Sequence, residues 1–186
     1  MALFANENAY DEIIKPLAEA YGVDVALIKA TMAQESSFNE KAFRAEPQIN
    51  DGSTGLMQIL MRTAKALGYT GDAMGLYDPS VNIMLGAKLI AQNITQAEGN
   101  LDIAISAYNA GFSAERPHDA KRDNEGNLIN QSYVNKVKTY YAYFKGAISS
   151  TEAETSNIIQ GASDNITLIG IGAALLAGFL VYLTFK

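Results

Sequence analysis

The feature that most constrains this chain is a long uncharged stretch near its end. Residues 166–185 contain no Asp, Glu, Lys or Arg and consist mainly of Ile, Leu, Ala, Gly and Phe. About twenty such residues match the hydrocarbon thickness of a bilayer. The alternative, a buried core helix, would need its whole circumference covered. We therefore predict a transmembrane helix at residues 166–185, in which Gly170, Ala174 and Gly178 form a stripe that could pack against a partner helix.

The remainder of the chain divides into a domain and a linker. Residues 147–165 are rich in Ser, Thr, Glu, Ala and Asn and read as a linker. Residues 1–146 carry apolar residues at helical spacing, and 48% of the whole chain is hydrophobic, which suffices for a packed core. No segment alternates convincingly like a strand, so the fold class predicted for residues 1–146 is all-α.

Helices are expected at 8–21, 25–36, 55–67, from 79 onward, 101–110 and 132–144. Asp24 and Asp78 are predicted N-caps, with Pro79 in the first helical position, and Gly146 is expected to close the last of these helices. The segments 38–54 and 68–77 read as loops. Residues 112–131 are a polar excursion, either a small hairpin or a flexible flap.

Composition excludes several kinds of chemistry. The net charge is −6 with no basic block, so a nucleic-acid partner is not expected. The chain has no cysteine and a single histidine, His118, which argues against thiolate nucleophiles, Cys-based zinc sites and a Ser-His-Asp relay. A calcium loop near residues 123–127 fails because Lys121 would occupy the first ligand position. We expect no metal and no cofactor, and chemistry based on carboxylates, hydroxyls and amides.

Glu35 is the candidate acid. It follows Thr31 and Met32 on the face of the 25–36 helix that should look inward, near the helix's C-terminal end. The negative end of the helix dipole and apolar surroundings both raise the pKa of a carboxyl group. A carboxyl that stays protonated at neutral pH can act as a general acid. Taken alone, however, Glu35 reads more simply as a helix-terminal side chain in water.

Five motifs in order change that interpretation. Glu35–Asn39 reads Glu-Ser-Ser-Phe-Asn, Gly55–Ile59 reads Gly-Leu-Met-Gln-Ile, and Ala107–Gly111 reads Ala-Tyr-Asn-Ala-Gly. Between and after them stand Asp-Pro-x-x-Asn-Ile in 78–83 and Tyr-Val-x-Lys-Val in 133–137. Together they resemble the soluble-type lytic transglycosylases, which share a lysozyme-like fold. The resemblance covers about residues 10 to 145.

The resemblance implies a substrate and a set of roles. The substrate is the glycan strand of peptidoglycan, cut between N-acetylmuramic acid and N-acetylglucosamine. Glu35 corresponds to the catalytic acid of the family. The positions implied to bind substrate or to shape the cleft are Ser36, Met57, Gln58, Tyr108, Asn109 and Tyr133.

A glycosidase usually pairs two carboxylates, and a second one is not obvious here. Asp51 and Asp102 are candidates only because they lie near motifs. The family implies that the substrate's N-acetyl group replaces the nucleophile and that the muramyl 6-hydroxyl attacks, leaving a 1,6-anhydro end. Two alternatives remain: a goose-type lysozyme-like hydrolase that delivers water, and an inactive wall-binding structural subunit.

The chain departs from the family pattern in the loop before Gly55. This loop is longer than usual, and Arg44 falls near the position of a family serine, for which Ser53 or Thr54 could substitute. Leu60-Met61 stands where the family usually has Met-Pro.

The charges around residues 166–185 predict an orientation. Glu152, Glu154 and Asp164 precede the stretch and Lys186 follows it, which places the enzyme outside the cytoplasm. The first residues lack the basic region of a secretory signal. We therefore expect a membrane-anchored protein of a bacteriophage virion with an internal membrane, which opens the wall during genome entry. The alternative is a cellular envelope or secretion-system enzyme in the bacterial inner membrane, facing the periplasm.

Overall fold

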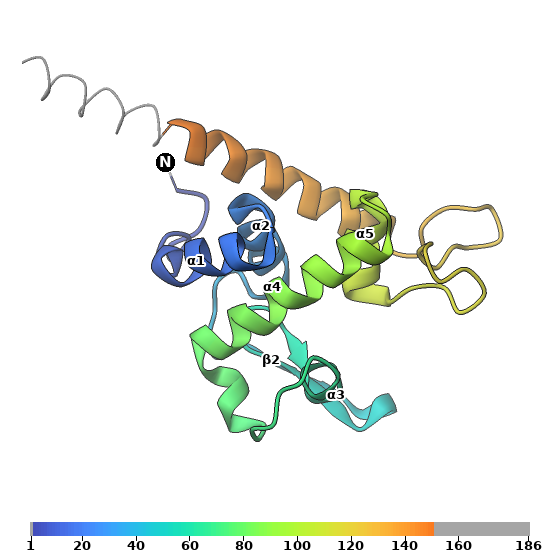
Figure 1. Ribbon diagram of the computed structural model, residues 1–186, viewed down its shortest axis with the longest axis horizontal. Helices are drawn as coiled ribbons and strands as arrows, with labels where there is room; N and C mark the ends of the chain where they lie inside the picture. The colour runs from blue at the N-terminus through green and yellow to red at the C-terminus, as the bar shows by residue number, and fades with distance from the viewer. Residues whose placement is uncertain (1, 151–186) are drawn as a thin grey trace, which may run out of the picture. The chain divides into compact units, whose positions relative to one another are not determined.

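The computed structural model describes residues 2–150, which are mostly helical. The helices are α1 (Asp11–Tyr21), α2 (Val25–Ser36), α3 (Met61–Ala66), α4 (Pro79–Gln96) and α5 (Leu101–Ala110), with two short 3-10 helices, η1 (Pro47–Ile49) and η2 (Met74–Tyr77). Residues 131–150 form a further helix. The long helix α4 packs against α1, α2 and α5. The sheet lies below α4 in the view of Figure 1.

Helix starts follow the expected capping chemistry. The Asp24 carboxylate accepts from Ala26 N at 2.9 Å and begins α2. The Asp78 carboxylate accepts from Ser80 N and Val81 N and begins α4, with Pro79 in its first turn. Both predicted N-caps are confirmed. These caps satisfy backbone donors that have no partner within the helix, and so they determine where each helix begins.

The all-α prediction is wrong in one respect, because the structure contains a small antiparallel sheet of order β1-β2-β3. Strand β1 (Phe43–Glu46) pairs with β2 (Asp51–Thr54), and β2 pairs with the two-residue β3 (Ile59–Leu60). The segment 38–54, predicted as a loop, is therefore largely a hairpin. Its strands are too short to show alternation, and β1 is mostly exposed, so hydrophobic periodicity could not reveal them.

The helix predicted at 55–67 begins at Met61 instead. Residues 55–58 form a turn in which Gly55 has φ +75° and Gln58 has φ 47°, both outside the helical region. The buried side chains of Leu56, Met57 and Ile59 mimic a helical face in sequence. In the structure these side chains reach the core from a turn and a strand. Their spacing in the sequence therefore suggested a helix that does not exist at 55–60.

The last described helix continues through residue 150, so Gly146 does not end it. One compact unit comprises Met1–Phe144, and the predicted boundary at 146 lies close to its end. Within residues 2–150, none of the helices combines the length and apolar character that crossing a bilayer requires. The predicted membrane helix at 166–185, its Gly170, Ala174 and Gly178 stripe and most of the 147–165 linker lie outside the described residues.

The polar excursion at 112–131 has a hairpin-like backbone. Isolated β-bridges join Phe112 to Ala120 and Arg122 to Leu128, both antiparallel. Of the two predicted alternatives, these pairings favour the hairpin. The excursion ends at the start of the helix at 131–150, next to the C-terminal end of α5.

Candidate active site

Glu35 lies at the penultimate position of α2, where the helix reaches a cleft. The helix ends because Ser37 adopts the left-handed conformation, with φ 52°. The preceding turn, with Thr31 and Met32, is buried, whereas Glu35 is half-buried. The helix therefore holds the carboxyl at the edge of the core and presents it to the cleft.

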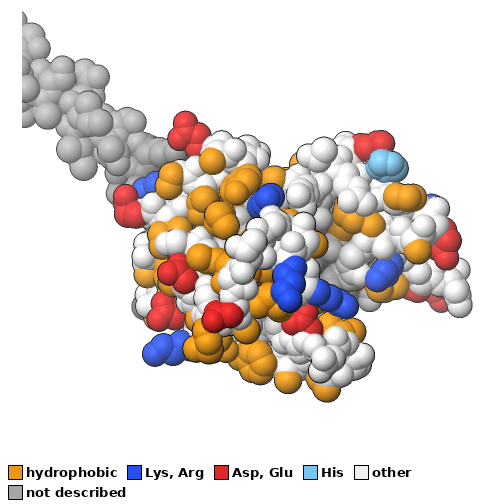
Figure 2. Space-filling model, turned by 60° about the horizontal axis from the view of Figure 1, so that its bottom comes forward, with side chains coloured by type: hydrophobic (Ala, Val, Ile, Leu, Met, Phe, Trp, Pro, Cys, Tyr) orange, Lys and Arg blue, Asp and Glu red, His pale blue; other side chains and the backbone are white. Residues whose placement is uncertain are grey.

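The cleft has a volume of about 270 Å³. It brings together four of the predicted site residues: Glu35 from α2, Gln58 from the turn before β3, and Tyr108 and Asn109 from α5. Ten residues outside the predicted site set complete it, chiefly from the hairpin, β3 and α3: Arg44, Glu46, Gln48, Ile49, Ser53, Ile59, Leu60, Arg62, Thr63 and Leu89. Figure 2 shows the side of the molecule that carries the sheet, where basic and acidic side chains are interspersed.

Tyr133 is the direct partner of the acid. Its hydroxyl donates to Glu35 Oε1 at 2.5 Å across 98 residues of sequence. Burial, and then the neighbouring Glu35 charge, raises the pKa of Tyr133 well above its usual value, so the phenol keeps its proton and remains a donor. Because Tyr133 occupies Oε1, the other carboxyl oxygen, Oε2, is left to carry a transferable proton.

Burial raises the pKa of Glu35, and two neighbours oppose this effect in part. The hydrogen bond from Tyr133 and the positive charge of Arg44 both favour the ionised carboxylate. The net result is a raised pKa, so the carboxyl keeps its proton to a higher pH than an exposed glutamate. This is the electrostatic requirement for a general acid that operates near neutral pH.

The turn at 55–58 is tied to both helices that carry the site. Ser36 Oγ donates to Leu56 O at 2.7 Å, which links this turn to the end of α2. Tyr108 Oη donates to Met57 O at 2.9 Å, which links it to α5. Burial and the Glu35 charge raise the pKa of Tyr108 well above its usual value, so this hydroxyl also stays a donor. Glu35, Tyr108 and Gln58 of this turn therefore form one hydrogen-bonded wall of the cleft.

Gln58 and Met57 have roles that their positions in the motif did not reveal. Gln58 lines the cleft, but its Nε2 donates to Gly55 O at 2.9 Å and to Ala42 O at 3.2 Å, so its amide group holds the turn in place. The Met57 side chain is fully buried and packs against Gly86, where a Cβ would lie 2.6 Å from the methionine methyl group. Substrate contacts by Ser36, Met57 and Gln58 stay predictions, and the observed geometry gives these residues supporting roles.

Neither of the predicted second carboxylates lines the cleft. The Asp51 carboxylate accepts from Gly52 N, Met61 N and Arg62 N, and so caps α3. Burial alone would raise its pKa, but these donors together hold the pKa below the usual value. Asp102 lies in the first turn of α5 and pairs with Lys138 at 2.8 Å. Both groups serve the fold.

Glu46 is the carboxylate that sequence reasoning missed. It lines the cleft, and its side chain is only 15% exposed. Arg44 pairs with Glu46 Oε1 at 2.7 Å, and Gln48 donates to Glu46 Oε2 at 2.7 Å, so both carboxylate oxygens are occupied. None of the sequence motifs includes Glu46, and the strand β1 that carries it was not predicted. Of the three residues considered for the family serine position, Arg44 and Ser53 are cross-strand partners that line the cleft, whereas Thr54 pairs with Phe43 and does not line it.

Replacing Arg44 with serine is expected to raise the pKa of Glu35. The guanidinium favours the ionised carboxylate, so its removal makes ionisation harder, and the unpaired Glu46 charge would act in the same direction. Carbon-13 NMR titration of the Glu35 carboxyl measures the change. The control is Arg116→Ser, which removes an equal charge from the excursion. A Glu35 pKa that stays constant or falls in Arg44→Ser would contradict this account.

Comparison with known proteins agrees with this geometry. The family model described as the transglycosylase SLT domain matches residues 12–131. The membrane-bound lytic murein transglycosylase C of Haemophilus influenzae is 36% identical over 143 residues, covering 69% of this chain and 39% of that protein. The transglycosylase of Enterobacteria phage PRD1 is 34% identical over 100 residues, covering 54% and 34%. The chain thus spans about two fifths or less of these relatives.

Two solved structures show the same fold over the described core. An inactive mutant of the lytic transglycosylase Slt from Pseudomonas aeruginosa matches with a TM-score of 0.61 and 27% identity, covering 76% of this chain and 25% of that one. The 70-kDa soluble lytic transglycosylase of Escherichia coli matches with a TM-score of 0.57 and 25% identity, covering 75% and 25%. The prediction of a mostly helical, lysozyme-like fold is confirmed, and the small sheet corrects its all-α part.

Proposed function

Because the chain belongs to the transglycosylase SLT domain family, we propose that it cleaves the glycan strands of peptidoglycan with Glu35 as the acid. The observation that carries this proposal is the half-buried Glu35 carboxyl, with a raised pKa, held by Tyr133 at the wall of a cleft large enough for sugar rings. The Haemophilus influenzae relative is named a lytic murein transglycosylase, which supports the same substrate class.

The proposed reaction is a non-hydrolytic cleavage. Glu35 gives its proton to the oxygen that links N-acetylmuramic acid to N-acetylglucosamine. The bond between this oxygen and the anomeric carbon of the muramyl residue then breaks. The muramyl N-acetyl group stabilises the positive charge that develops at the anomeric carbon. The muramyl 6-hydroxyl then bonds to that carbon while Glu35, now a carboxylate, takes its proton. No water is consumed, the product ends in a 1,6-anhydro ring, and Glu35 returns to its protonated form.

The other cleft residues suit sugar recognition. Asn109 offers an amide, which can donate and accept hydrogen bonds with hydroxyl and N-acetyl groups. Tyr108 stands beside Glu35 in the wall, and its ring offers an apolar face while its hydroxyl is engaged by Met57 O. We therefore propose Tyr108 and Asn109 as substrate contacts and Tyr133 as the residue that orients the acid.

Glu46 keeps a second outcome open, hydrolysis as in goose-type lysozymes. Inverting glycosidases use a second carboxylate to activate water, and Glu46 is a carboxylate in the same cleft. Its two oxygens are already engaged by Arg44 and Gln48, which disfavours a role as a base. Transglycosylation, which needs only Glu35, is therefore the proposed reaction.

Digestion of purified sacculi by the full chain, followed by mass spectrometry of the soluble products, distinguishes the outcomes. Products with 1,6-anhydro-muramyl ends are expected. Reducing ends, which are heavier by one water, would indicate hydrolysis and would direct attention to Glu46. Binding to sacculi without release of fragments would indicate a wall-binding subunit and would overturn the proposal.

We further propose that the protein opens the wall locally for a phage, anchored in a virion membrane through residues 166–185. The supporting observations are the uncharged stretch in the sequence and the similarity to a phage PRD1 transglycosylase. The names of the Haemophilus relatives include the word membrane-bound, which leaves a cellular envelope enzyme as the rival. Antibody detection in purified virions tests the choice, since absence there with presence in the host envelope would favour the rival.

A further inference from the structure

Asn130, near the end of the excursion at 112–131, links this segment to the cleft residue Asn109. It lies immediately before the helix at 131–150, and its backbone carbonyl accepts from Tyr133 N at 2.9 Å. Its side chain faces the C-terminal part of α5: Nδ2 donates to Ser106 O at 3.0 Å and to Asn109 Oδ1 at 3.1 Å. One residue therefore contacts both the backbone of Tyr133, the partner of the acid, and the amide of Asn109.

The orientation of the Asn130 amide is determined by Ser106. The Ser106 carbonyl can only accept, so it requires the NH2 group of Asn130 to face it. The Ser106 hydroxyl donates to Asn130 Oδ1 at 2.6 Å, and Ser106 is fully buried. A flipped Asn130 amide would place its oxygen against the Ser106 carbonyl oxygen, where no hydrogen bond can form. Ser106 thus leaves a single favourable orientation.

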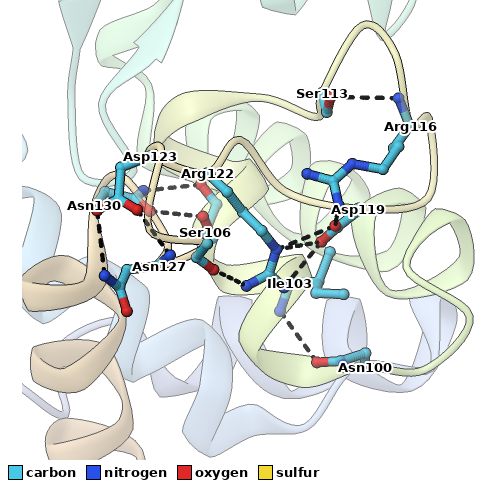
Figure 3. A network of polar contacts seen from close by, with 11 residues as sticks. Asn100, Ile103, Ser106, Ser113, Arg116, Asp119, Arg122, Asp123, Asn127 and Asn130 are labelled. Carbon is cyan, nitrogen blue, oxygen red and sulfur yellow. Dashed lines mark hydrogen bonds and ion pairs between the residues drawn. The ribbon is translucent and has the colours of Figure 1, made fainter.

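The excursion that leads to Asn130 has polar contacts of its own. Asp119 pairs with Arg116 and Arg122 at 3.1 Å, and Arg122 also donates to Gly126 O at 2.8 Å. The Asp123 carboxylate accepts from the backbone of Glu125 and Asn127 at 2.9 Å. Figure 3 shows this polar network, which includes Ser106 and Asn130. These polar contacts order the excursion together with the buried side chains of Ala120 and Leu128.

We propose that Asn130 is a positioning residue that sets the orientation of the Asn109 amide. Because Asn130 donates to Asn109 Oδ1, the NH2 group of Asn109 is left to donate to an oxygen of the bound glycan. The buried Ser106 thus fixes the amide of Asn130, and Asn130 in turn determines which side of the Asn109 amide donates into the cleft. This inference rests on the proposed glycan-cleaving function.

Asn130→Asp is the decisive variant, because an ionised carboxylate can only accept. The Asn109 amide should then rotate to donate to it and turn its own oxygen toward the substrate. At neutral pH we expect kcat/KM on soluble glycan strands to fall roughly tenfold, the scale of one hydrogen bond lost in a site. Below the pKa of the new carboxyl, its regained O–H can donate, and activity relative to wild type should recover. Taking the ratio at each pH cancels the titration of Glu35.

Two comparisons separate positioning from loss of structure. Asn135→Asp adds the same charge to an exposed site on the following helix and should follow wild type at every pH. In an Asn109→Ala background, Asn130→Asp should cost much less than tenfold, because its target is gone. If thermal unfolding shows that Asn130→Asp does not fold, Asn130→Ala replaces it and should lose a few-fold in activity with a ratio independent of pH.

The result that overturns the inference is distinct from failure of the proposed function. If wild type cleaves sacculi but Asn130→Asp retains full activity, or loses it equally at every pH, Asn130 does not orient Asn109. Full additivity with Asn109→Ala would also contradict the proposal. If wild type itself releases no fragments, the proposed function has failed.

Discussion

Glu35→Gln is expected to lower the rate of glycan-strand cleavage by about a hundred- to ten-thousand-fold, the usual contribution of a positioned general acid. The amide has nearly the same shape, and its oxygen can still accept from the Tyr133 hydroxyl that now bonds Glu35 Oε1. It has no proton to give to the leaving oxygen, and it cannot take one from the attacking hydroxyl. Both proton transfers of the proposed reaction therefore fail while the wall of the cleft is preserved.

The matched control is Glu40→Gln, which changes a glutamate five positions along the chain. Glu40 accepts from the Tyr10 hydroxyl at 3.2 Å and is not part of the cleft that holds Glu35. Its variant should release muropeptides from sacculi at the wild-type rate. Release is measured by chromatography at equal enzyme concentration, after circular dichroism has shown that both variants fold. Wild-type release by Glu35→Gln would refute the assignment of the acid.

The helices that position the acid could be predicted because local signals agree. For α2 and α4, apolar spacing coincides with an aspartate cap, and the structure confirms both starts at Asp24 and Asp78. Helix α5 begins at Leu101, directly after the N-cap Asn100, whose side chain accepts from Ile103 N. In each case the information lies within about one turn of the residue concerned, which is the range over which a sequence pattern is informative.

The sheet could not be predicted from apolar spacing, because its strands are short and the first of them is mostly exposed. Strand β1 exposes most of its side chains, and β3 has only two residues. Asp51 holds the start of α3 and Gln58 holds Ala42, contacts that span 10 to 16 residues. A pattern of apolar residues carries no record of such bonds, and so the turn at 55–58 was mistaken for helix.

The same limit applies within the site. Motifs identified Glu35, Tyr108 and Asn109, which the fold brings to one cleft. They did not identify Glu46 or the role of Asn130, because the first depends on a strand pairing and the second on contacts across 21 and 24 residues. Family motifs identify the residues whose chemistry the family shares. Contacts that are particular to this chain become visible only in its structure.

The largest stability effect is expected at Asn82, which joins β2, η2 and the turn at 55–58 to the N-terminal part of α4. Its Nδ2 donates to Leu76 O at 2.7 Å and to Thr54 O at 2.9 Å, and its Oδ1 accepts from Met57 N at 2.7 Å. The side chain is 1% exposed, so water cannot replace these bonds. Asn82→Ala should therefore lower the free energy of unfolding by about 3–5 kcal/mol, given roughly 1–3 kcal/mol for each buried group left without a partner.

Asn93→Ala is the matched control, on the same helix and at a buried asparagine. Asn93 makes one long bond, from Nδ2 to Ala104 O at 3.4 Å, so its loss should cost only about 1 kcal/mol. Urea unfolding followed by circular dichroism gives both values by linear extrapolation. If both variants lowered the free energy of unfolding by the same amount, the three hydrogen bonds of Asn82 would contribute no more than the single bond of Asn93, which would contradict this account.

Asn82→Ala should also reduce cleavage under conditions where it remains folded. The Met57 carbonyl accepts from Tyr108, and the Met57 N–H donates to Asn82. The position of the turn at 55–58 therefore depends on both side chains. Gly55, at φ +75°, leaves room for the Asn82 amide, since a Cβ there would lie 2.6 Å from Nδ2. With the amide gone, the turn that carries Gln58 loses its anchor to α4. Activity per folded molecule should fall in Asn82→Ala and stay at the wild-type value in Asn93→Ala.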